Sequence, residues 1–525
     1  MRSTLLFAAL ALALGTAEAA ETQRYVVLTP EATIGHLHAT VDGDTVSVDY
    51  DVKDNGRGPT MKETLRLSEA GLPVEWSISG ATTFGSKVDE RFAVADGKAT
   101  WKDAVGAGEA ANASGALYIG QSGTPWALGV YARALMADDD GRIATLPGGE
   151  LRLEKGDTLE VGTGDAKQTV QRVTLSGLDL DPTHLLVEAD GDLFAVLATR
   201  GLLIREGYEA DAERLRQLTV ELGEQRFIAM QAEVAHRYEH PVRIRNVRVF
   251  DPKTGTRSAP VSVVVYRNRI SGIQPLDATG TGPEVVVEGE GGTLVPGLYE
   301  MHGHIGQNRT VLNLAAGITS VRDMGNDNDV LDRLIESIES GKLAGPRITR
   351  AGFIEGRSPF NSNNGYLVSS QAQALEAVRW YAARGFPQIK LYNSMNPAWS
   401  AAAAAEAHRL GLRVSGHIPA FTNADAMIAA GYDELTHINQ VMLGWVLTPE
   451  EDTRTLLRLT ALKRLDQLDL ASPRVRKTMD AIVEKKVAVE PTLAIHENLL
   501  LNQDGQVPSG QAEWIENLPV GAQRN

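Results

Sequence analysis

The sequence predicts two kinds of fold in one chain: an antiparallel all-β domain, followed by a parallel α/β domain. From residue 21 to about residue 205, apolar and polar residues alternate, as in residues 46–52, which is typical of half-buried strands. From residue 291 onward, short apolar runs alternate with helical segments, as in a parallel sheet with crossover helices. The length of 525 residues is sufficient for several domains with large cores.

The composition is that of a globular protein that acts on small molecules. Hydrophobic residues make up 43% and charged residues 22% of the chain, which excludes a largely disordered or a multi-span membrane protein. The formal net charge of −16 disfavours nucleic acid and anionic membranes as partners. Because the chain has no cysteine, any metal must be held by nitrogen and oxygen ligands.

Residues 1–19 have the pattern of a cleaved signal peptide. Arg2 precedes an apolar run over residues 5–14, and Ala17-Glu18-Ala19 is the small-x-small pattern of a cleavage site. The alternative is a buried N-terminal strand or helix. No stretch reaches the roughly 20 apolar residues of a membrane span. We therefore expect an exported protein, periplasmic in a bacterium or secreted, without membrane insertion.

Four further segments follow the signal peptide. An all-β domain is predicted over residues 20–205, with Asp-Gly hairpin turns at residues 42–43, 96–97 and 190–191. A connecting helix is predicted within residues 206–240 and a short β region over residues 241–292, with a strand pair around Arg267-Asn268. Residues 293–525 form the α/β part, and the role of the N-terminal β domain stays open.

The α/β part contains seven candidate strands. Helices are predicted between them, one over residues 328–340 that ends at Gly341 and one that begins at Ser472-Pro473. The strand candidates are residues 293–304, 318–322, 347–351, 388–392, 413–417, 434–438 and 487–492.

The strongest chemical signal is the run from Pro296 to His304. Strand side chains alternate between faces, so His302 and His304 project from the same side with a glycine between them, which suits Zn²⁺. The same spacing occurs in His36-Leu37-His38, but without a Pro-Gly turn or a later series of histidines. We predict that His36 and His38 are ordinary residues of a sheet surface.

Three more polar residues end apolar strands in the α/β part. His417, His437 and Lys390 would converge with the first histidine pair at one mouth of a parallel barrel. An unpaired ammonium inside a barrel is costly, so Lys390 must be neutralised. Either a buried carboxylate pairs with it, or burial depresses its pKa so that the free amine captures CO₂ as a carbamate that can bridge two metals.

From about residue 241 onward, the chain resembles the amidohydrolase superfamily of metal-dependent hydrolases. The matching segments are residues 246–251, 261–273, 295–304, 317–325 and 345–347, together with Lys390, His417 and His437. The resemblance implies a (β/α)₈ barrel of the TIM type with a partial β-sandwich and two divalent metal ions, with zinc expected. It places His302 and His304 on one metal and His417 and His437 on the other, with carboxylated Lys390 bridging them. The pattern is nearest to imidazolonepropionase-like enzymes, Xaa-Pro dipeptidases and ochratoxinase.

The function implied by this resemblance is cleavage of a C–N bond by a metal-activated hydroxide. The expected substrate is a small amide or a dipeptide-like molecule, and a homo-oligomer is compatible with the sequence. Arg350, Arg357 and Tyr392 lie at or after predicted strand ends, where they could bind a substrate carboxylate; the alternative for them is salt links internal to the fold.

One part of the family pattern has no counterpart in the sequence. The resemblance implies a catalytic aspartate at the end of an eighth strand, and Asp504 lies in a turn-like Asn-Gln-Asp-Gly run instead. No catalytic residue is therefore identified, and we expect the sequence to be the N-terminal portion of a longer coding sequence. The alternative is a non-catalytic binding protein of the same fold that lacks the aspartate.

Overall fold

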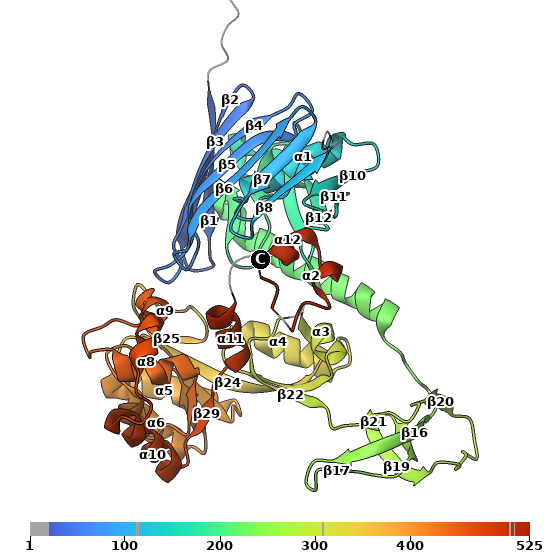
Figure 1. Ribbon diagram of the computed structural model, residues 1–525, viewed down its shortest axis with the longest axis vertical. Coiled ribbons are helices and arrows are strands. Elements are labelled where there is room, and N and C mark those ends of the chain that lie inside the picture. The colour runs from blue at the N-terminus through green and yellow to red at the C-terminus, as the bar shows by residue number, and fades with distance from the viewer. Residues whose placement is uncertain are drawn as a thin grey trace, which may run out of the picture. The chain divides into compact units, whose positions relative to one another are not determined.

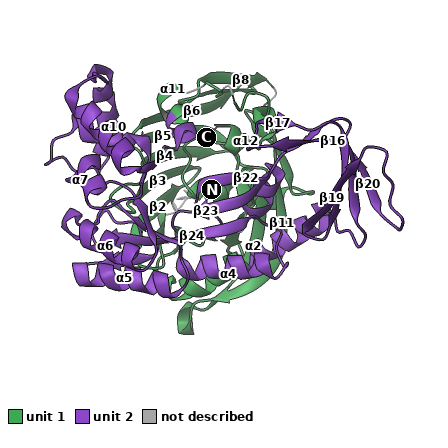
Figure 2. Cartoon of the chain, turned by 90° about the horizontal axis from the view of Figure 1, so that it is seen from below, with its two compact units in different colours: residues 1–220, 497–525 green, residues 221–496 purple. Residues whose placement is uncertain are grey.

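The computed structural model describes residues 20–524, apart from residues 112, 114, 307, 308, 503–505 and 509. The predicted signal peptide lies outside the described residues. Contacts divide the chain into two units: unit 1 extends to residue 220 and takes in the residues from 497 onward, and unit 2 comprises residues 221–496 (Figure 2). The boundary falls inside helix α2 (Ala212–Val234), the predicted connector, which contributes to both units. The predicted domain limits differ at the C-terminal end, where residues 497–525 group with the β domain.

Unit 1 is built on one large sheet, as the alternating pattern predicts. Its described strands are β1 (Glu21–Leu28), β2 (Thr33–Asp42), β3 (Thr45–Val52), β4 (Thr60–Leu67), β5 (Pro73–Ala81), β6 (Lys87–Ala95), β7 (Lys98–Lys102), β8 (Ala107–Ala111), β9 (Leu117–Tyr118), β10 (Arg142–Leu146), β11 (Glu150–Val161), β12 (Gln168–Ser176), β13 (Thr183–Val187), β14 (Leu193–Val196) and β15 (Leu202–Arg205). They run in the order β8 to β1 and then β15 to β9, and each consecutive pair is antiparallel except β9 with β10. Asp96 and Gly97 join β6 to β7 with φ angles of 50° and 75°, which confirms the predicted two-residue hairpin turn.

Helix α1 (Trp126–Ala137) interrupts the strands of unit 1 and was not expected from the sequence (Figure 1). Trp126, Val130 and Leu135 of this helix share one core with strand residues such as Leu65 and Ile78. The helix is buried on most of its surface, so its sequence has no polar stripe at helical spacing. For this reason, no amphipathic pattern in the sequence predicts a helix at this position.

Glu63 of β4 is a buried carboxylate at the N-terminal end of α1. It is 3% exposed and accepts a hydrogen bond from the backbone N–H of Thr124, two residues before the helix. Burial raises the pKa of Glu63 to about 7, since the ionised form loses its hydration.

The raised pKa of Glu63 predicts that the protein loses stability as the pH rises from 4.5 to 7. In this window the folded state keeps the proton and the unfolded state loses it, so the free energy of unfolding falls with pH by up to roughly 3 kcal/mol and then levels off. Glu63→Gln keeps an acceptor for Thr124 and should remove this slope, measured by denaturant unfolding across the pH range. The matched control is Glu75→Gln, on the exposed side of neighbouring β5, whose pH profile should follow the wild type. Superimposable profiles for all three proteins would contradict the assignment.

Unit 2 begins with a small sheet, in agreement with the predicted short β region. Strands β18 and β19 form the predicted pair and turn at Arg267, which has a positive φ of 53°. The described strands of this sheet are β16 (Val242–Asp251), β17 (Thr256–Arg257), β18 (Val261–Tyr266), β19 (Arg269–Pro275), β20 (Val285–Glu288) and β21 (Thr293–Leu294).

The rest of unit 2 is a parallel α/β sheet that curls like a barrel, as predicted. Its described strands are β22 (Leu298–Gly303), β23 (Ile318–Asp323), β24 (Arg347–Gly356), β25 (Tyr366–Val368), β26 (Gln388–Leu391), β27 (Arg413–Gly416), β28 (Glu434–Thr436) and β29 (Ala488–Glu490). All pairs are parallel, in the order β22-β23-β24-β26-β27-β28-β29, with β25 beside β24. Each strand of the path overlaps a predicted segment, but β23 runs one residue and β24 five residues beyond the predicted ends. The predicted strand 293–304 is divided at Pro296-Gly297: β21 pairs with β16 in the small sheet, and β22 pairs with β23.

Helices connect the parallel strands. The described helices from here to the end of the chain are α3 (Thr310–Ala315), α4 (Asn328–Glu339), α5 (Gln371–Ala383), α6 (Pro397–Arg409), α7 (Ala424–Ala429), α8 (Ile438–Val446), α9 (Leu457–Thr460), α10 (Pro473–Lys485), α11 (Leu493–Leu501) and α12 (Val520–Arg524). Helices α4 and α10 confirm the two predicted helices; α4 is capped by the Asp327 carboxylate, which accepts from the backbone N–H groups of Asp329 and Val330. None of the helices in the described part of the chain is both long and apolar enough to cross a membrane.

Candidate metal centre

The five predicted metal ligands lie at the carboxyl-terminal ends of parallel strands. His302 is the second-last residue of β22, and His304 directly follows that strand. Lys390 lies in β26. His417 directly follows β27, and His437 directly follows β28. In a parallel barrel-like sheet these ends share one rim, so residues up to 135 positions apart in the sequence meet there.

The structure brings these five side chains together. The ring centroids of His302 and His304 are 5.5 Å apart, and those of His302 and His437, and of His417 and His437, are each 4.5 Å apart. Lys390 Nζ lies 3.0 Å from Nε2 of His302. His36 and His38, by contrast, lie on strand β2 of unit 1, where His36 pairs with Asp49.

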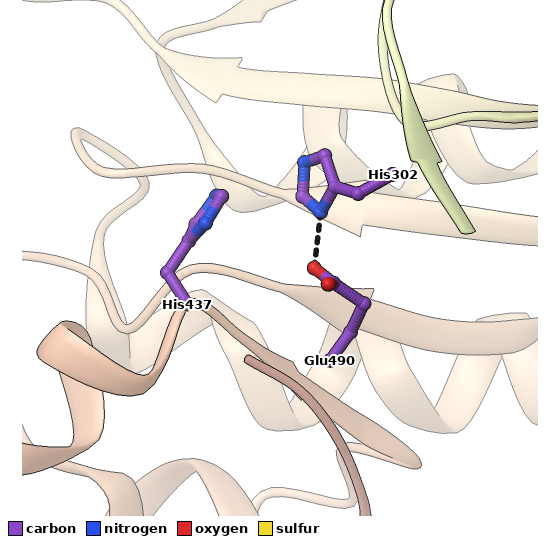
Figure 3. Close-up of side chains that lie close together, drawn as sticks. All are labelled: His302, His437 and Glu490. Carbon is purple, nitrogen blue, oxygen red and sulfur yellow. Dashed lines mark hydrogen bonds and ion pairs between the residues drawn. The ribbon is translucent and has the colours of Figure 1, made fainter. Parts of the chain in front are cut away.

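Each of the four histidines uses its Nδ1 atom to contact an oxygen. Nδ1 of His302 is 2.5 Å from Oε2 of Glu490, the last residue of β29, and Nδ1 of His304 is 2.6 Å from the Gly325 carbonyl (Figure 3 shows His302, His437 and Glu490). The contact for His417 is with Asn393 Oδ1 at 2.6 Å, and for His437 with Thr492 Oγ1 at 2.9 Å. The Thr492 hydroxyl donates its own hydrogen to the Pro491 carbonyl, so its oxygen accepts from His437.

These contacts fix the tautomer of all four rings. Each partner oxygen is an acceptor, so each Nδ1 carries the hydrogen and each Nε2 keeps its lone pair. Metal-bound histidines are typically held in this way, with the second ring nitrogen donating to a carboxylate or carbonyl. Nε2 of His417 is buried and has no hydrogen-bond partner. A buried nitrogen lone pair without a donor fits a metal ion, and the donor set of four imidazoles suits zinc.

The centre is desolvated, which keeps its four histidines in the neutral form. Burial and the neighbouring Lys390 lower the pKa of His302 and of His437 to about 2, and burial also holds the pKa values of His304 and His417 below their usual range. Burial lowers the pKa of Lys390 to about 7, although Asp323 and Glu490 partly offset this effect. Within the described residues, no carboxylate oxygen lies within 4.0 Å of Lys390 Nζ, so the predicted alternative of a paired carboxylate is not observed.

Local backbone geometry holds two of the histidines in place. Gly416, just before His417, has a φ of 150°, and a Cβ atom there would lie 2.2 Å from the Leu391 carbonyl oxygen. Only glycine allows β27 to approach β26 so closely at this point. His437 itself has a φ of 64°, an uncommon conformation for a side chain with a Cβ, and its N–H donates to the Glu490 carbonyl. Such backbone strain is concentrated at functional sites.

The predicted substrate-binding residues are not all at the centre. The Tyr392 ring packs on His417 with centroids 4.0 Å apart, beside the predicted ligands. Arg357 is exposed after β24. Arg350 instead pairs with Asp332, donates to the Arg384 carbonyl at 3.0 Å and stacks on Phe386, so the structure does not bring it to the histidines. The reason is the length of β24, which runs on to Gly356 and leaves Arg350 well before its end.

The residues that orient the histidines were not among the predicted site residues. Glu490, Asn393 and Thr492 each follow or end an apolar strand, which is the same signal that identified His417 and His437. Glu490 also groups with His302 and His437 as three side chains whose ligand atoms lie within 4.8 Å of one another. Arg458 of α9 was missed as well; its charge contributes to the lowered pKa values of His417 and His437.

A buried ion pair near the histidines links distant strands of the parallel sheet. Arg322 of β23 donates to both carboxylate oxygens of Glu434 of β28, at 2.7 and 2.8 Å, and its Nε donates to the Met301 carbonyl. The two side chains are 12% and 9% exposed.

Removing one partner of this ion pair should lower the free energy of unfolding. Arg322→Met leaves the Glu434 charge buried without a partner and should lower the free energy of unfolding by about 3–5 kcal/mol, whereas Arg322→Met with Glu434→Leu should lose less. The matched control is Arg464→Met, which breaks the more exposed bidentate pair with Glu451 and should cost about 0–1 kcal/mol. Denaturant unfolding measures all four proteins. A double variant that is as unstable as Arg322→Met alone, or less stable, would contradict a coupled buried pair.

No family model and no curated protein matches the sequence. Among solved structures, the chain is similar to a Xaa-Pro dipeptidase with bound methionine in its active site (22% identity, TM-score 0.37, covering 49% of this chain and 68% of that one). It is also similar to bottromycin amidohydrolase (19% identity, TM-score 0.34, covering 49% of this chain and 51% of that one). A third similar structure is A. niger ochratoxinase (16% identity, TM-score 0.33, covering 55% of this chain and 72% of that one).

Proposed function

We propose that unit 2 is a metal-dependent hydrolase that cleaves a C–N bond, of the amide or peptide type, in a small substrate. The observation that carries this proposal is the set of four histidines whose Nδ1 atoms each contact an oxygen, which directs Nε2 to metal binding. Nε2 of His302 contacts the buried Lys390, and Nε2 of His417 has no hydrogen-bond partner. We further propose that the protein is exported, on the signal-peptide pattern of residues 1–19.

The donor atoms divide naturally into two pairs. His302 and His304 come from one strand end and would hold one ion, and His417 and His437 from adjacent strands would hold a second. Bound divalent ions, with zinc favoured by the imidazole donors, would supply a hydroxide at neutral pH and polarise the substrate carbonyl.

Lys390 is the group that would join the two pairs. Its lowered pKa leaves a substantial share of free amine at neutral pH, and no paired carboxylate competes for it among the described residues. The Nζ lone pair can form a bond to the carbon of CO₂ while one N–H proton leaves to solvent, giving an N-carboxylate with two oxygen donors. This step converts a buried neutral amine into an anion, which would pair with divalent ions held by the neutral imidazoles.

The remaining residues of the centre hold protons and orient groups. Glu490 accepts from His302 Nδ1 with one oxygen and from the Thr492 N–H with the other, at 3.0 Å, so it positions the ring and is not free to act as a base. The Tyr392 ring packs on His417, and the charge of Arg458 contributes to the lowered pKa values of His417 and His437. We assign these two side chains to a substrate carboxylate, since arginine pairs well with that group.

The test uses the second His-x-His pair of this chain as its control. Replacing His302 and His304 by asparagine should remove metal from the purified protein and abolish hydrolysis of a panel of N-acyl amino acids and Xaa-Pro dipeptides. Replacing His36 and His38 by asparagine should change neither the metal content nor the hydrolysis, because these residues lie on the unit 1 sheet. Metal content is measured by elemental analysis and hydrolysis by amine release.

Three outcomes separate the possibilities. Metal bound through the His302 pair together with hydrolysis supports the proposal. Metal bound without turnover of any amide supports the binding protein of the same fold instead. Equal metal content in the two double variants would overturn the assigned centre.

A further inference from the structure

Three carboxylates lie in one row on the buried face of the unit 1 sheet. In the strand register, Glu63 of β4 faces Ile78 of β5, which in turn faces Glu90 of β6. Arg91 faces Lys102, so Asp103, the next residue along, continues the row beside Glu90. The Glu90 and Asp103 side chains are 2% and 3% exposed. Glu90 accepts hydrogen bonds from the Tyr118 hydroxyl and from the backbone N–H groups of Gln121 and Ser122. Like charges opposite one another still repel, so a cation beside Glu90 and Asp103 would stabilise the row.

Arg524 of α12 supplies that cation from a distant part of the sequence. Its Nη2 contacts Oδ2 of Asp103 and lies 3.5 Å from Oε1 of Glu90 and 3.1 Å from the Tyr118 hydroxyl. The guanidinium carbon is 5.2 Å from the centroid of the Tyr118 ring. In the described ranges, no other lysine or arginine nitrogen lies within 4.0 Å of a carboxylate of this row.

The backbone around Arg524 also forms hydrogen bonds with other residues of unit 1. The Gln121 side-chain amide donates to the Arg524 carbonyl at 3.0 Å, and the Gly521 N–H donates to the Leu178 carbonyl at 2.9 Å. Val520 is buried in the main core of unit 1. Figure 1 shows α12 beside the strands of the β domain. The segment 520–524 is therefore bound through its backbone, an apolar side chain and a charge.

Arg524 nevertheless makes fewer hydrogen bonds than its side chain allows. Its Nε and Nη1 atoms are buried without a hydrogen-bond partner, so only one of its three nitrogens is bonded. Oε2 of Glu63, at the other end of the row, is also buried and unpartnered. A cavity of about 590 Å³ adjoins the segment and is lined in part by Gly148, Glu150, Ser176 and Asn517. The side-chain contacts of Arg524 with Asp103, Glu90 and Tyr118 are thus all made through Nη2.

We propose that unit 1 carries a binding site for the guanidinium group of an arginine in a polypeptide segment, and that residues 520–524 of this chain occupy it. Glu90, Asp103 and Tyr118 form the site for the side chain, and Gln121 binds the backbone carbonyl of the arginine. The site is separate from the metal centre of unit 2, so it gives the N-terminal β domain a docking function of its own.

Chemical rescue tests this proposal in the full chain. Arg524→Ala should lower the melting temperature of unit 1 by roughly 10 °C, because it leaves Glu90 and Asp103 buried without a cation. Millimolar ethylguanidinium should restore much of that loss and ethylammonium much less, while neither shifts the wild type. Fluorescence of Trp76 and Trp101, whose ring centroids lie 6.1 and 6.3 Å from that of Tyr118, reports filling of the site.

Two further variants keep the test decisive. Arg152→Ala removes an exposed arginine that lines the same cavity and pairs with Glu150, and it should show neither the loss nor the rescue. Arg524→Ala combined with Asp103→Asn should be more stable than Arg524→Ala alone, since it relieves the repulsion with Glu90. The proposal is overturned if ethylguanidinium rescues no better than ethylammonium, or if Arg524→Ala melts with the wild type.

Discussion

The hydrogen bonds at Nδ1 of the four histidines are the interactions on which the metal centre depends. Each comes from a different element: the end of β29, the turn after β23, the turn after β26 and the residue after Pro491. They hold a proton on Nδ1 of each ring and leave Nε2 as the nitrogen with a lone pair; Nε2 of His302 lies 3.0 Å from Lys390 Nζ. Without them, neutral imidazoles could present either nitrogen, and the ligand geometry would be undefined.

The same centre imposes an electrostatic constraint on the parallel sheet. It gathers four imidazoles and an amine in a buried space, which keeps the imidazoles uncharged and lowers the pKa of Lys390 to about 7. Asp323, fully buried, accepts from the backbone N–H groups of Ile305 and Gly325, which fixes the turns that carry His304 and its partner carbonyl. The polar residues near the centre thus shape the loops around it and leave the ligands neutral.

Sequence patterns predicted the strands and the five polar side chains that meet at their ends, because both follow from apolar runs that end in a polar residue. Apolar runs followed by a polar residue identified β26 to β28 and the histidines after β27 and β28. The same rule applied to Glu490 and Thr492 would have found the orienting residues, but their chemistry is ordinary in isolation. Helix α1 and the position of Arg350 could not be predicted, because the first depends on burial on most of its surface and the second on how far β24 extends. The contact between Arg524 and the carboxylate row joins residues more than 400 positions apart and leaves no local signal.

Crystallography of the zinc-loaded protein, with anomalous scattering measured at the zinc edge, tests the central claim most directly. The account predicts two anomalous peaks, each about 2.0–2.1 Å from the Nε2 atoms of its histidine pair, and continuous density for a carboxylate on Lys390 Nζ. Zinc bound instead through Nδ1, or by Glu490 with His302 and His437 beside an unmodified Lys390, would contradict it.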